Sequence, residues 1–395
     1  MTMKGHGWWH VSNAGDVPSP QLLIYPDRAL ENLRRMVALA GDAARLTPHV
    51  KTHKLEPLVR AHLDAGITRF KCATIAEAES IAVAGGRDIL LAHQPVGPGI
   101  ARLIALATQF PETRVSVIAD DAETIRAIGA AASAAGLTIP ILLDLDVGMH
   151  RTGIEPGPAA AELYRSLTTT PGVEPGGLHA YDGHLRDADL AERLRKSDEA
   201  FADVDRLRQA LLGQNLPVPR VVAGGSPTFP AHVRRTGVEL SPGTTVLWDA
   251  GYATQLPDLA FLPAAVLLTR VVSKPGGQRV TLDLGHKAVA SEGPHPRVAL
   301  IAPDGLPAAP ADSALGAVAA ALGVPLLDAT FVGHSEEHLV LETPGAAGLA
   351  VGDVLYGIPW HVCPTVALHA EAVIVRDQTA SDRWPIRARD RRLSI

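Results

Sequence analysis

Short apolar runs alternate with longer, polar-faced stretches over the first two thirds of the chain. Residues 121–135, 159–167 and 187–212 carry apolar side chains at helical spacing, and a similar stretch, 27–39, precedes the first apolar run. The apolar runs have the length of buried strands. Strands are predicted over Ala44–Val50, Arg69–Ala73, Asp88–Ala92, Arg114–Ala119, Pro140–Leu145, Gly177–Ala180, Arg220–Ala223 and Val238–Leu247.

Eight strands that alternate with helices predict an α/β fold, a closed (β/α)8 TIM-type barrel over residues 27–255. The alternative is an open, doubly wound sheet. Such a sheet normally carries a glycine-rich dinucleotide fingerprint after its first strand. The first predicted strand is followed by Lys51-Thr52-His53-Lys54 instead, so the barrel is favoured.

The helical alternation stops after about Leu256. Residues 256–395 have β-like runs broken by Gly and Pro, with a helical or irregular insertion at 307–321, and they predict a mostly antiparallel β domain. The early run Gln21–Tyr25 can add a strand, so residues 1–26 are assigned to the same domain. Its other strands are predicted over Ala264–Ser273, Gln278–Asp283, Arg297–Ile301, His338–Leu341, Asp353–Tyr356 and Ala372–Val375.

Composition narrows the class of protein. The 395 residues carry a net charge of −6 without a cluster of Lys and Arg, so no nucleic-acid partner is expected. No apolar run is long enough to span a bilayer, and Met1–Asn13 has no apolar signal-peptide core. Two cysteines, Cys72 and Cys363, cannot build a disulfide framework. We therefore expect a soluble, cytoplasmic protein with no membrane partner.

Lysine is scarce in this chain, and Lys51 directly follows the first predicted strand. At the C-terminal end of a barrel strand its amine would project into a pocket. Desolvation lowers the pKa of a lysine, and the neutral amine can form a Schiff base with an aldehyde. The flanking His49 and His53 favour this interpretation over a solvated surface lysine.

Other polar residues follow the predicted strands at the same end of the barrel. Gly224-Gly225-Ser226 ends the seventh strand and Ser241–Thr245 lies in or near the eighth, where barrels often cradle a phosphate on backbone N–H groups. A Schiff-base lysine together with a phosphate cradle predicts pyridoxal phosphate, with a metal hydrolase as the alternative. The remaining polar strand ends are His93, Asp120, Asp144, Asp146, Tyr181, Asp182 and His184.

A second group of candidate residues is the segment His361-Val362-Cys363-Pro364-Thr365. In an extended segment, residues i and i+2 face the same side, so His361 and Cys363 could share one metal ion. Imidazole and thiolate both suit zinc. The alternative is a pair of half-buried residues of a β domain with no chemistry.

These segments resemble the D-threonine aldolase and D-serine dehydratase family. Its members are metal-dependent pyridoxal-phosphate enzymes of the alanine-racemase-like fold, fold type III. The similarity runs through almost the whole chain, and the combination of Pro48–Lys54 with His361–Thr365 is its most specific part. The other segments are Asp144–Gly153 (DLDVGMHRTG), His179-Ala180-Tyr181, Ala223–Ser226, Ser241–Thr244, Ser335–His338 and Leu368-His369.

The resemblance implies a role for several residues. Lys51 would carry the Schiff base with pyridoxal phosphate. Arg151 would lie near the phenolic oxygen of the cofactor, and Tyr181 beside its pyridine ring. The implied phosphate cradle comprises Gly224, Gly225, Ser226, Gly243 and Thr244, and the implied metal ligands are His361 and Cys363.

Two positions depart from the aldolase pattern. D-threonine aldolases usually carry aspartate at the second metal position, whereas Cys363 is more similar to the D-serine dehydratases and favours zinc over manganese or magnesium. The aldolases also place a histidine six residues after the strand-6 tyrosine. That position is Asp187 here, and His184 offers an imidazole three residues earlier. His184 is thus the predicted base for the substrate's β-hydroxyl, with Asp187 as the alternative.

The predicted protein is a lyase for D-3-hydroxyamino acids that depends on pyridoxal phosphate and a divalent metal. The favoured reaction is D-threonine aldolase-type cleavage to glycine and an aldehyde. The alternative is a D-serine dehydratase, which would give a 2-oxo acid and ammonia. An amino-acid racemase would need a second acid/base opposite Lys51 and no metal, and a non-enzymatic pyridoxal-binding protein usually lacks the β domain. Family members are commonly dimers, so we expect a homodimer.

Overall fold

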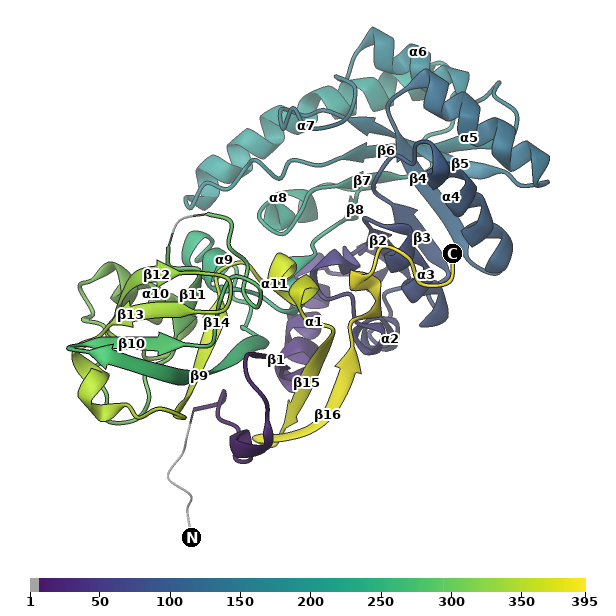
Figure 1. Ribbon diagram of the computed structural model, residues 1–395. Helices are drawn as coiled ribbons and strands as arrows, with labels where there is room; N and C mark the ends of the chain where they lie inside the picture. Colours follow the sequence, from purple (N-terminus) through teal and green to yellow (C-terminus); the bar gives the residue numbers. More distant parts are fainter. Residues whose placement is uncertain (1–6, 294) are drawn as a thin grey trace. The chain divides into compact units, whose positions relative to one another are not determined.

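The computed structural model describes residues 7–293 and 295–395, which form two compact units (Figure 1). The first unit comprises Arg34–Gly243 and Arg387–Ile395. The second comprises the described residues up to Leu33 and Thr244–Ile386. Each unit is built around its own sheet. The domain boundary predicted after residue 255 stays a prediction, while the compact units themselves divide after Gly243.

The first unit contains a parallel sheet whose strands, β2 to β8, follow one another in sequence order. Each strand from β2 to β7 is followed by a helix, as predicted for a TIM-type barrel. The strands are β2 (Arg69–Cys72), β3 (Asp88–Leu91), β4 (Arg114–Ala119), β5 (Ile139–Leu145), β6 (Val173–Ala180), β7 (Val221–Ala223) and β8 (Glu239–Leu240). The helices are α1 (Pro26–Ala40), which begins in the second unit, α2 (Glu56–Asp64), α3 (Ile75–Val83), α4 (Pro98–Gln109), α5 (Ala122–Ala134), α6 (Pro158–Ser166), α7 (Leu190–Gly213) and α8 (Phe229–Val233).

The barrel strands are buried on both faces, as is typical of parallel strands covered by helices. Every residue of β5 is buried. Successive side chains point to opposite faces of a strand, and Ile141 and Leu143 accordingly belong to the large core that packs against the helices. Helices α4 to α7 flank the sheet on this outer side (Figure 1). Leu142 faces the barrel interior, in a small separate core with Leu90, Ile118 and Val222.

The first predicted strand, Ala44–Val50, is wrong as a regular strand. Turns of 3-10 helix occupy Ala43–Arg45 and Val50–Thr52 and leave only a short extended stretch between them. Pro48 lies within that stretch and has no N–H with which to continue a ladder. The eighth predicted strand is also too long: β8 ends at Leu240, and a 3-10 turn follows at residues 244–246.

The short extended stretch nevertheless closes the barrel. Leu46 forms a parallel bridge with Leu240 of β8, and His49 forms one with Lys71 of β2. The stretch therefore takes the place of the first strand and joins the two edges of the sheet. The closed barrel predicted from the alternation of strands and helices is confirmed.

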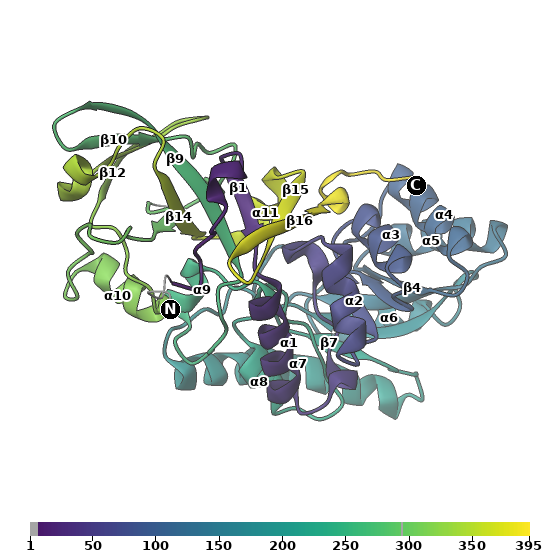
Figure 2. The same ribbon diagram turned by 90° about the horizontal axis from the view of Figure 1, so that it is seen from below.

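The end of the chain returns to the barrel. In Figure 2 the segment Arg387–Ile395, drawn in yellow, lies beside α3. The buried carboxylate of Glu79 accepts hydrogen bonds from the backbone N–H groups of Ser394 at 3.1 Å and Ile395 at 3.3 Å. Arg102 donates a hydrogen bond to the carbonyl of Ile395 at 2.9 Å. This segment therefore groups with the barrel unit, whereas the predicted β domain extended to residue 395.

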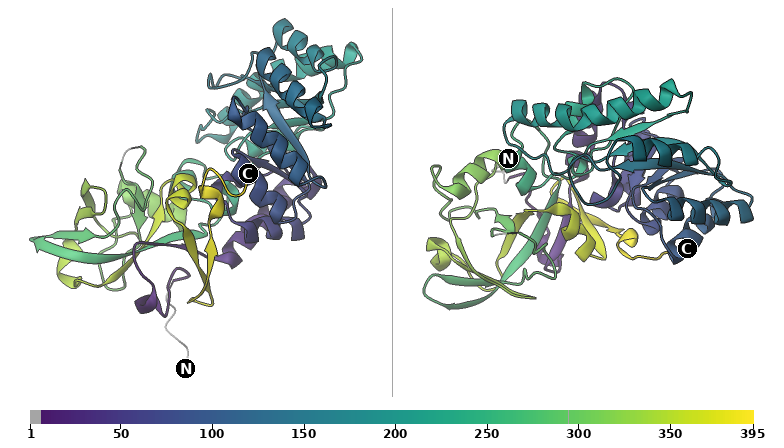
Figure 3. Two further views of the ribbon diagram at one scale, coloured as in Figure 1. Left: turned by 45° about the vertical axis from the view of Figure 1, so that its right-hand side comes forward. Right: turned by 90° about the horizontal axis from the view of Figure 1, so that it is seen from above.

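The second unit contains a mostly antiparallel sheet with the order β12-β13-β10-β9-β1-β15-β16, and β14 and β11 extend it from β9. The long strand β9 and the shorter strand β10 pair as a hairpin, drawn in green in Figure 3. Strand β1 pairs with β9, which confirms that the run starting at Gln21 adds a strand to this sheet. The strands are β1 (Gln21–Ile24), β9 (Ala265–Gly276), β10 (Arg279–Leu282), β11 (Val298–Leu300), β12 (Thr330–His334), β13 (Leu339–Glu342), β14 (Val354–Pro359), β15 (Glu371–Arg376) and β16 (Thr379–Pro385), and the helices are α9 (Ala250–Gln255), α10 (Ala314–Leu322) and α11 (Val362–Leu368).

Within the described ranges, none of the helices combines the length and the apolar character that a bilayer crossing requires.

Two buried histidines stack inside the barrel unit. The rings of His53 and His62 are 5.6 Å apart and nearly parallel, and the Nδ1–H group of His62 donates to the carbonyl of Leu58 at 2.6 Å. Burial lowers the pKa of His62 to about 4, and burial also lowers the pKa of His53 well below its ordinary value. Both imidazoles are therefore neutral at pH 7.

We predict that these histidines make the barrel sensitive to acid. The unfolded chain takes up a proton at His62 near pH 6.5, whereas the folded chain does so only near pH 4. The stabilisation is therefore complete above pH 6.5 and is lost as the pH falls towards 4. At pH 5 the expected loss from His62 is about 2 kcal/mol in the free energy of unfolding. Urea unfolding at pH 7 and pH 5, followed by the helical circular dichroism signal, measures it.

The control is His62→Asn, which keeps an N–H donor near the Nδ1 position but does not titrate. This variant should lose less stability between pH 7 and pH 5 than the wild type. An equal loss in both proteins would contradict the assignment to His62.

Candidate active site

A cavity of about 490 Å³ lies at the C-terminal ends of the barrel strands. Active sites of such barrels lie at this end. The cavity brings together predicted site residues from several strands, among them Lys51, Arg151 and Tyr181. His93 and Asp120, which were predicted as polar strand ends, line it as well.

Lys51 enters the cavity from the 3-10 turn Val50–Thr52, which follows the extended stretch from Leu46 to His49. His49 precedes this turn, and its Nδ1 atom accepts a hydrogen bond from the backbone N–H of Lys51 at 3.3 Å. Burial, followed by the charges of Lys51 and Lys71, lowers the pKa of His49 well below its ordinary value. His49 is therefore a neutral imidazole with its proton on Nε2. The other flanking histidine, His53, caps the N–H of Leu55 at 3.0 Å and does not line the cavity.

A second lysine, Lys71 of β2, lines the same cavity and was not predicted as a site residue. Its side chain is buried, with 2% exposed. Burial and then the charge of Lys51 lower the pKa of Lys71 to about 7. The sequence signal was a lysine between Phe70 and Cys72, two apolar residues of a predicted strand that are fully buried.

Three basic side chains lie around the ring of Tyr181. The Nζ atoms of Lys51 and Lys71 lie 5.9 and 5.7 Å from the ring centroid, and the guanidinium carbon of Arg151 lies 4.8 Å from it. At these distances each cation is attracted by the aromatic face. Like charges gathered in one cavity favour a ligand with negative charge.

Strands β5 and β6 place Asp144 opposite His179. The Nδ1–H group of His179 donates to Asp144 at 2.7 Å, and the hydroxyl of Thr152 donates to the other carboxylate oxygen at 2.9 Å. Burial lowers the pKa of His179, although Asp144 acts in the opposite direction, so the ring is neutral. Its Nε2 atom is buried and has no hydrogen-bond partner within the described part of the chain. An unpaired buried acceptor on a cavity wall indicates a ligand that donates to it.

The predicted phosphate cradle lies in the loops after β7 and β8. The N–H of Gly243 donates to the hydroxyl of Ser226 at 3.2 Å, which joins the two loops. A Cβ atom at Gly243 would lie 3.1 Å from the Cβ of His49, so glycine keeps this approach open. The hydroxyl of Ser241 is buried and lacks a partner among the described residues, as expected of a group that awaits a ligand.

Two further glycines of the cradle follow β7. Gly224 has a φ of +77°, in the left-handed region that favours glycine. A Cβ atom at Gly225 would lie 3.0 Å from the ring of Tyr181. The N–H of Gly225 donates to the hydroxyl of Thr228 at 3.3 Å, and that hydroxyl donates to the buried carboxylate of Asp182 at 2.6 Å. Asp182 therefore positions the loop of the cradle.

The predicted metal ligands lie in the second unit, at the start of α11 and not in an extended segment. His361 directly precedes the helix, and Cys363 is in its first turn. Although burial acts in the opposite direction, a hydrogen bond with Cys363 and the charges of Cys363, Asp249 and Glu292 raise the pKa of His361 to about 9. The two side chains thus meet despite the incorrect local prediction. The hydroxyl of Thr244 lies 3.7 Å from the Cys363 sulfur.

The pair His361 and Cys363 supplies two donors for a metal. Among the residues that the structure describes, no group of three or more His, Cys, Asp or Glu side chains is arranged to hold an ion. The Nδ1 atom of His361 contacts the carboxylate of Glu292 at 2.5 Å. Imidazole and thiolate fit zinc chemically, and a zinc site on this pair would keep positions open for other ligands.

Neither predicted base lies on the wall of the barrel cavity. His184 is exposed and lies beside Gly148, where an added Cβ atom would be 3.3 Å from its Nε2. Asp187 is held in an ion pair with Lys196 at 2.6 Å. The imidazole of His184 is therefore more accessible than the carboxylate of Asp187, which is held in an ion pair.

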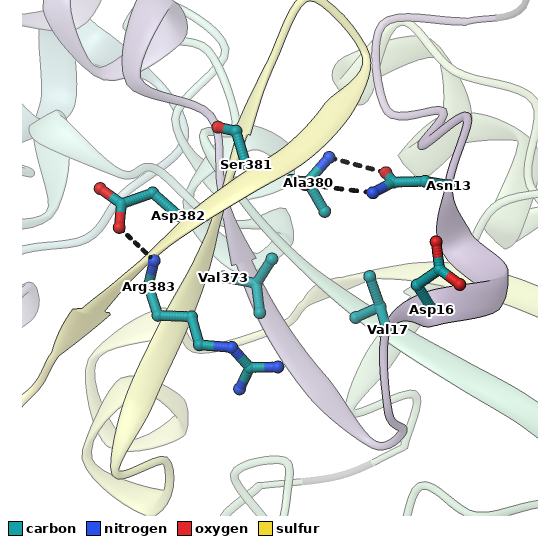
Figure 4. Close-up of a pocket in the computed structure, with 8 residues that line it drawn as sticks. All are labelled: Asn13, Asp16, Val17, Val373, Ala380, Ser381, Asp382 and Arg383. Atoms are coloured by element: carbon teal, nitrogen blue, oxygen red, sulfur yellow. Dashed lines mark hydrogen bonds between the residues drawn. The ribbon is translucent and has the colours of Figure 1, made fainter.

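A further cavity of about 420 Å³ lies in the second unit, between the N-terminal segment and β16 (Figure 4). The amide of Asn13 donates to the carbonyl of Ala380 at 3.1 Å and accepts from its N–H at 2.9 Å. Asp382 accepts from the N–H of Arg383 at 2.7 Å, and the Arg383 side chain pairs with Glu371. These polar groups hold the segment in place, and we assign no chemistry to this cavity.

Comparison with known proteins places this geometry in a family. Residues 24–248 match the family described as alanine racemase, N-terminal domain, and residues 264–375 match a serine dehydratase domain. The chain is 32% identical to D-threonine aldolase from Arthrobacter sp over 381 residues, which cover 95% of this chain and 93% of that one. The chain belongs to the D-threonine aldolase and D-serine dehydratase family.

Other relatives of the present chain are named for different activities. It is 27% identical to 3-hydroxy-D-aspartate aldolase from Paracoccus denitrificans, over 95% of this chain and 92% of the relative. It is 29% identical to D-threo-3-hydroxyaspartate dehydratase from a Delftia species, over 58% of this chain and 61% of the relative. The crystal structure of D-threonine aldolase from Filomicrobium marinum has a TM-score of 0.82 at 27% identity and covers 95% of this chain and 96% of that one.

The family implies pyridoxal phosphate and a metal ion. The barrel cavity fits this cofactor, because it offers an amine at Lys51 and an unpaired acceptor at His179, and Gly243 closely approaches His49 of the cavity wall. The donors of His361 and Cys363 fit a metal ion of the zinc type.

Proposed function

We propose that the protein is a pyridoxal phosphate- and metal-dependent lyase that cleaves D-3-hydroxyamino acids to glycine and an aldehyde. One observation carries the proposal. Lys51 opens, together with Lys71 and Arg151, into a single cavity in a chain that is 32% identical to D-threonine aldolase. An amine among cations is the arrangement that an anionic aldehyde cofactor requires.

The cofactor would be attached at Lys51. When bound, it supplies an electron sink for the negative charge left at the substrate Cα. His49 accepts the backbone N–H of Lys51 and so fixes the turn that carries the amine. Asp144 fixes the tautomer of His179 and leaves the Nε2 atom as an acceptor. The remaining cofactor contacts are proposed for Arg151, Tyr181, Gly224, Gly225, Ser226, Gly243 and Thr244.

The metal is proposed to be zinc, held by His361 and Cys363. A thiolate ligand favours zinc over the harder ions manganese and magnesium. A bound metal ion lowers the pKa of a coordinated hydroxyl group. The role of this ion in the reaction rests on the family to which the chain belongs.

Two proton transfers distinguish the possible reactions. In aldol cleavage the β-hydroxyl loses its proton, and we propose the imidazole of His184 as the acceptor. In dehydration the α-proton is removed, and the amine of Lys51 is the acceptor available in the cavity. The dehydratase is the second candidate because Cys363 is the residue expected of D-serine dehydratases and because a dehydratase is among the relatives.

Borohydride reduction of the purified protein should attach the cofactor to Lys51. Lys54 is occupied by an ion pair with the buried carboxylate of Glu77, and the exposed Lys287 pairs with Glu336 and Glu337. Neither amine faces the cavity. Peptide mapping by mass spectrometry identifies the modified lysine. A pyridoxyl group found on Lys54 or Lys287 would rule out the proposed site.

Substitution of His361 and Cys363 by alanine should remove both the metal and the turnover. Metal analysis should find zinc in the wild type and none in the double variant, because each substitution deletes one donor. The absorbance of the bound cofactor should persist, since the barrel cavity is unchanged. His338→Ala, which changes an exposed histidine of the same unit, is the control and should retain zinc. Full turnover of the double variant in the presence of a chelator would exclude a metal from the mechanism.

The products decide between the two reactions. The wild type should release glycine from D-threonine and D-phenylserine, and His184→Ala should slow this cleavage by about 10²- to 10⁴-fold, the usual effect of losing a general base. Cofactor binding and hydrogen exchange at Cα should persist in the variant, because Lys51 is intact. Formation of pyruvate and ammonia from D-serine, without glycine from the other two substrates, would contradict the aldolase proposal and support the dehydratase.

A further inference from the structure

Lys71 branches from the barrel wall at a deeper level than Lys51. The backbone of Lys71 forms a parallel bridge with His49. Lys51 follows His49 by two residues and therefore lies nearer to the mouth of the cavity. Phe70 and Cys72 belong to the core between the sheet and the helices. Side chains alternate along a strand, so Lys71 points into the barrel interior.

The amine of Lys71 has no anionic partner of its own. Among the described residues, none forms a hydrogen bond or ion pair with its Nζ atom, and its ring contact is with Tyr181. Asp144 is already bonded to His179 and Thr152. A buried amine without a partner costs free energy, so its presence indicates a ligand that completes it.

The charges around Lys71 determine what that ligand is. The nearby carboxylates raise the pKa of Lys71, but burial and the charge of Lys51 have the larger effect and lower it to about 7. A ligand with an electronegative acceptor would restore the charge of the amine. The titratable and charged groups that line the cavity with Lys71 or act on its charge are His49, Lys51, His93, Asp120, Asp144, Arg151, His179, Tyr181 and Asp182.

We propose that Lys71 donates a hydrogen bond to an acceptor atom on the pyridine ring system of bound pyridoxal phosphate and thereby sets the protonation of the cofactor. This inference rests on the proposed function. Attachment at Lys51 places the aldehyde carbon of the cofactor at that amine, and the substrate enters from the mouth. The pyridine ring system is then the part of the cofactor that would reach the amine of Lys71, which lies deeper in the cavity.

The test compares Lys71→Met with Lys71→Arg in the reconstituted protein. The visible absorbance of bound pyridoxal phosphate is titrated against pH. Removal of a neighbouring positive charge makes protonation of the chromophore easier, so Lys71→Met should raise its pKa by about one to two units. Lys71→Arg keeps the charge and should titrate close to the wild type. Lys274→Met, which removes an exposed lysine of β9, should have no effect.

The same samples separate this inference from the proposed function. Peptide mapping after borohydride reduction must find the cofactor on Lys51 in the wild type; a wild type that binds no cofactor there overturns the proposed function itself. An unchanged pKa in a folded, Lys51-loaded Lys71→Met protein overturns only the role of Lys71. An unchanged pKa with a raised KM would overturn it too, because Lys71 would then bind the substrate carboxylate. If Lys71→Met does not fold, Lys71→Gln keeps a donor without the charge and must show the raised pKa.

Discussion

The extended stretch from Leu46 to His49 is the constraint on which the rest of the barrel unit depends. A sheet of seven strands would leave two open edges, and this stretch pairs with both of them. The N–H of His49 donates to the carbonyl of Pro242 at 2.9 Å on the β8 side, and its bridge to Lys71 lies on the β2 side. The chain then turns directly into Lys51. The same short stretch therefore closes the sheet and positions the amine of Lys51.

The same closure determines the electrostatics of the cavity. It brings Lys51 and Lys71 from neighbouring segments to one aromatic ring, where Arg151 joins them from the loop after β5. Burial keeps the imidazoles of His49 and His179 neutral, so they add hydrogen-bonding groups without adding positive charge. The cavity thus combines cations for an anionic ligand with an acceptor at His179 for a donor group. Neither the cations nor the acceptor at His179 alone would distinguish this cavity from a solvated cleft.

The sequence predicts the architecture well where strands are buried and poorly where they are not. The barrel strands β2 to β7 are apolar runs because helices cover them, and their alternation with helices identifies the fold. Strands β12 and β16 were missed because most of their residues are partly or fully exposed and leave no apolar run. The first barrel strand was predicted in the right place but with the wrong geometry, since Pro48 and the two 3-10 turns limit it to isolated bridges.

The candidate site was only partly predictable for related reasons. Lys51 stands out in the sequence because it follows a predicted strand. Lys71 lies inside a predicted strand, where a lysine between apolar residues is not recognised as a site residue. His361 and Cys363 were predicted to lie in an extended segment, but they lie at the start of a helix, where their side chains interact. The pairing of Asp144 with His179 depends on the register of β5 and β6, which periodicity does not specify.

The two candidate reactions differ little in what they require of the barrel. Both leave negative charge at Cα, and both depend on the same amine and the same electron sink. A cavity built around Lys51, Lys71 and Arg151 serves either reaction, which is consistent with an aldolase and a dehydratase both being relatives of this chain. The residues that distinguish the reactions act on the β-hydroxyl. The groups that we propose for this role are His184, which does not line the cavity, and Cys363, in the second unit. Under the proposed function, a change of reaction would need substitutions of the residues that act on the hydroxyl and would leave the barrel cavity intact.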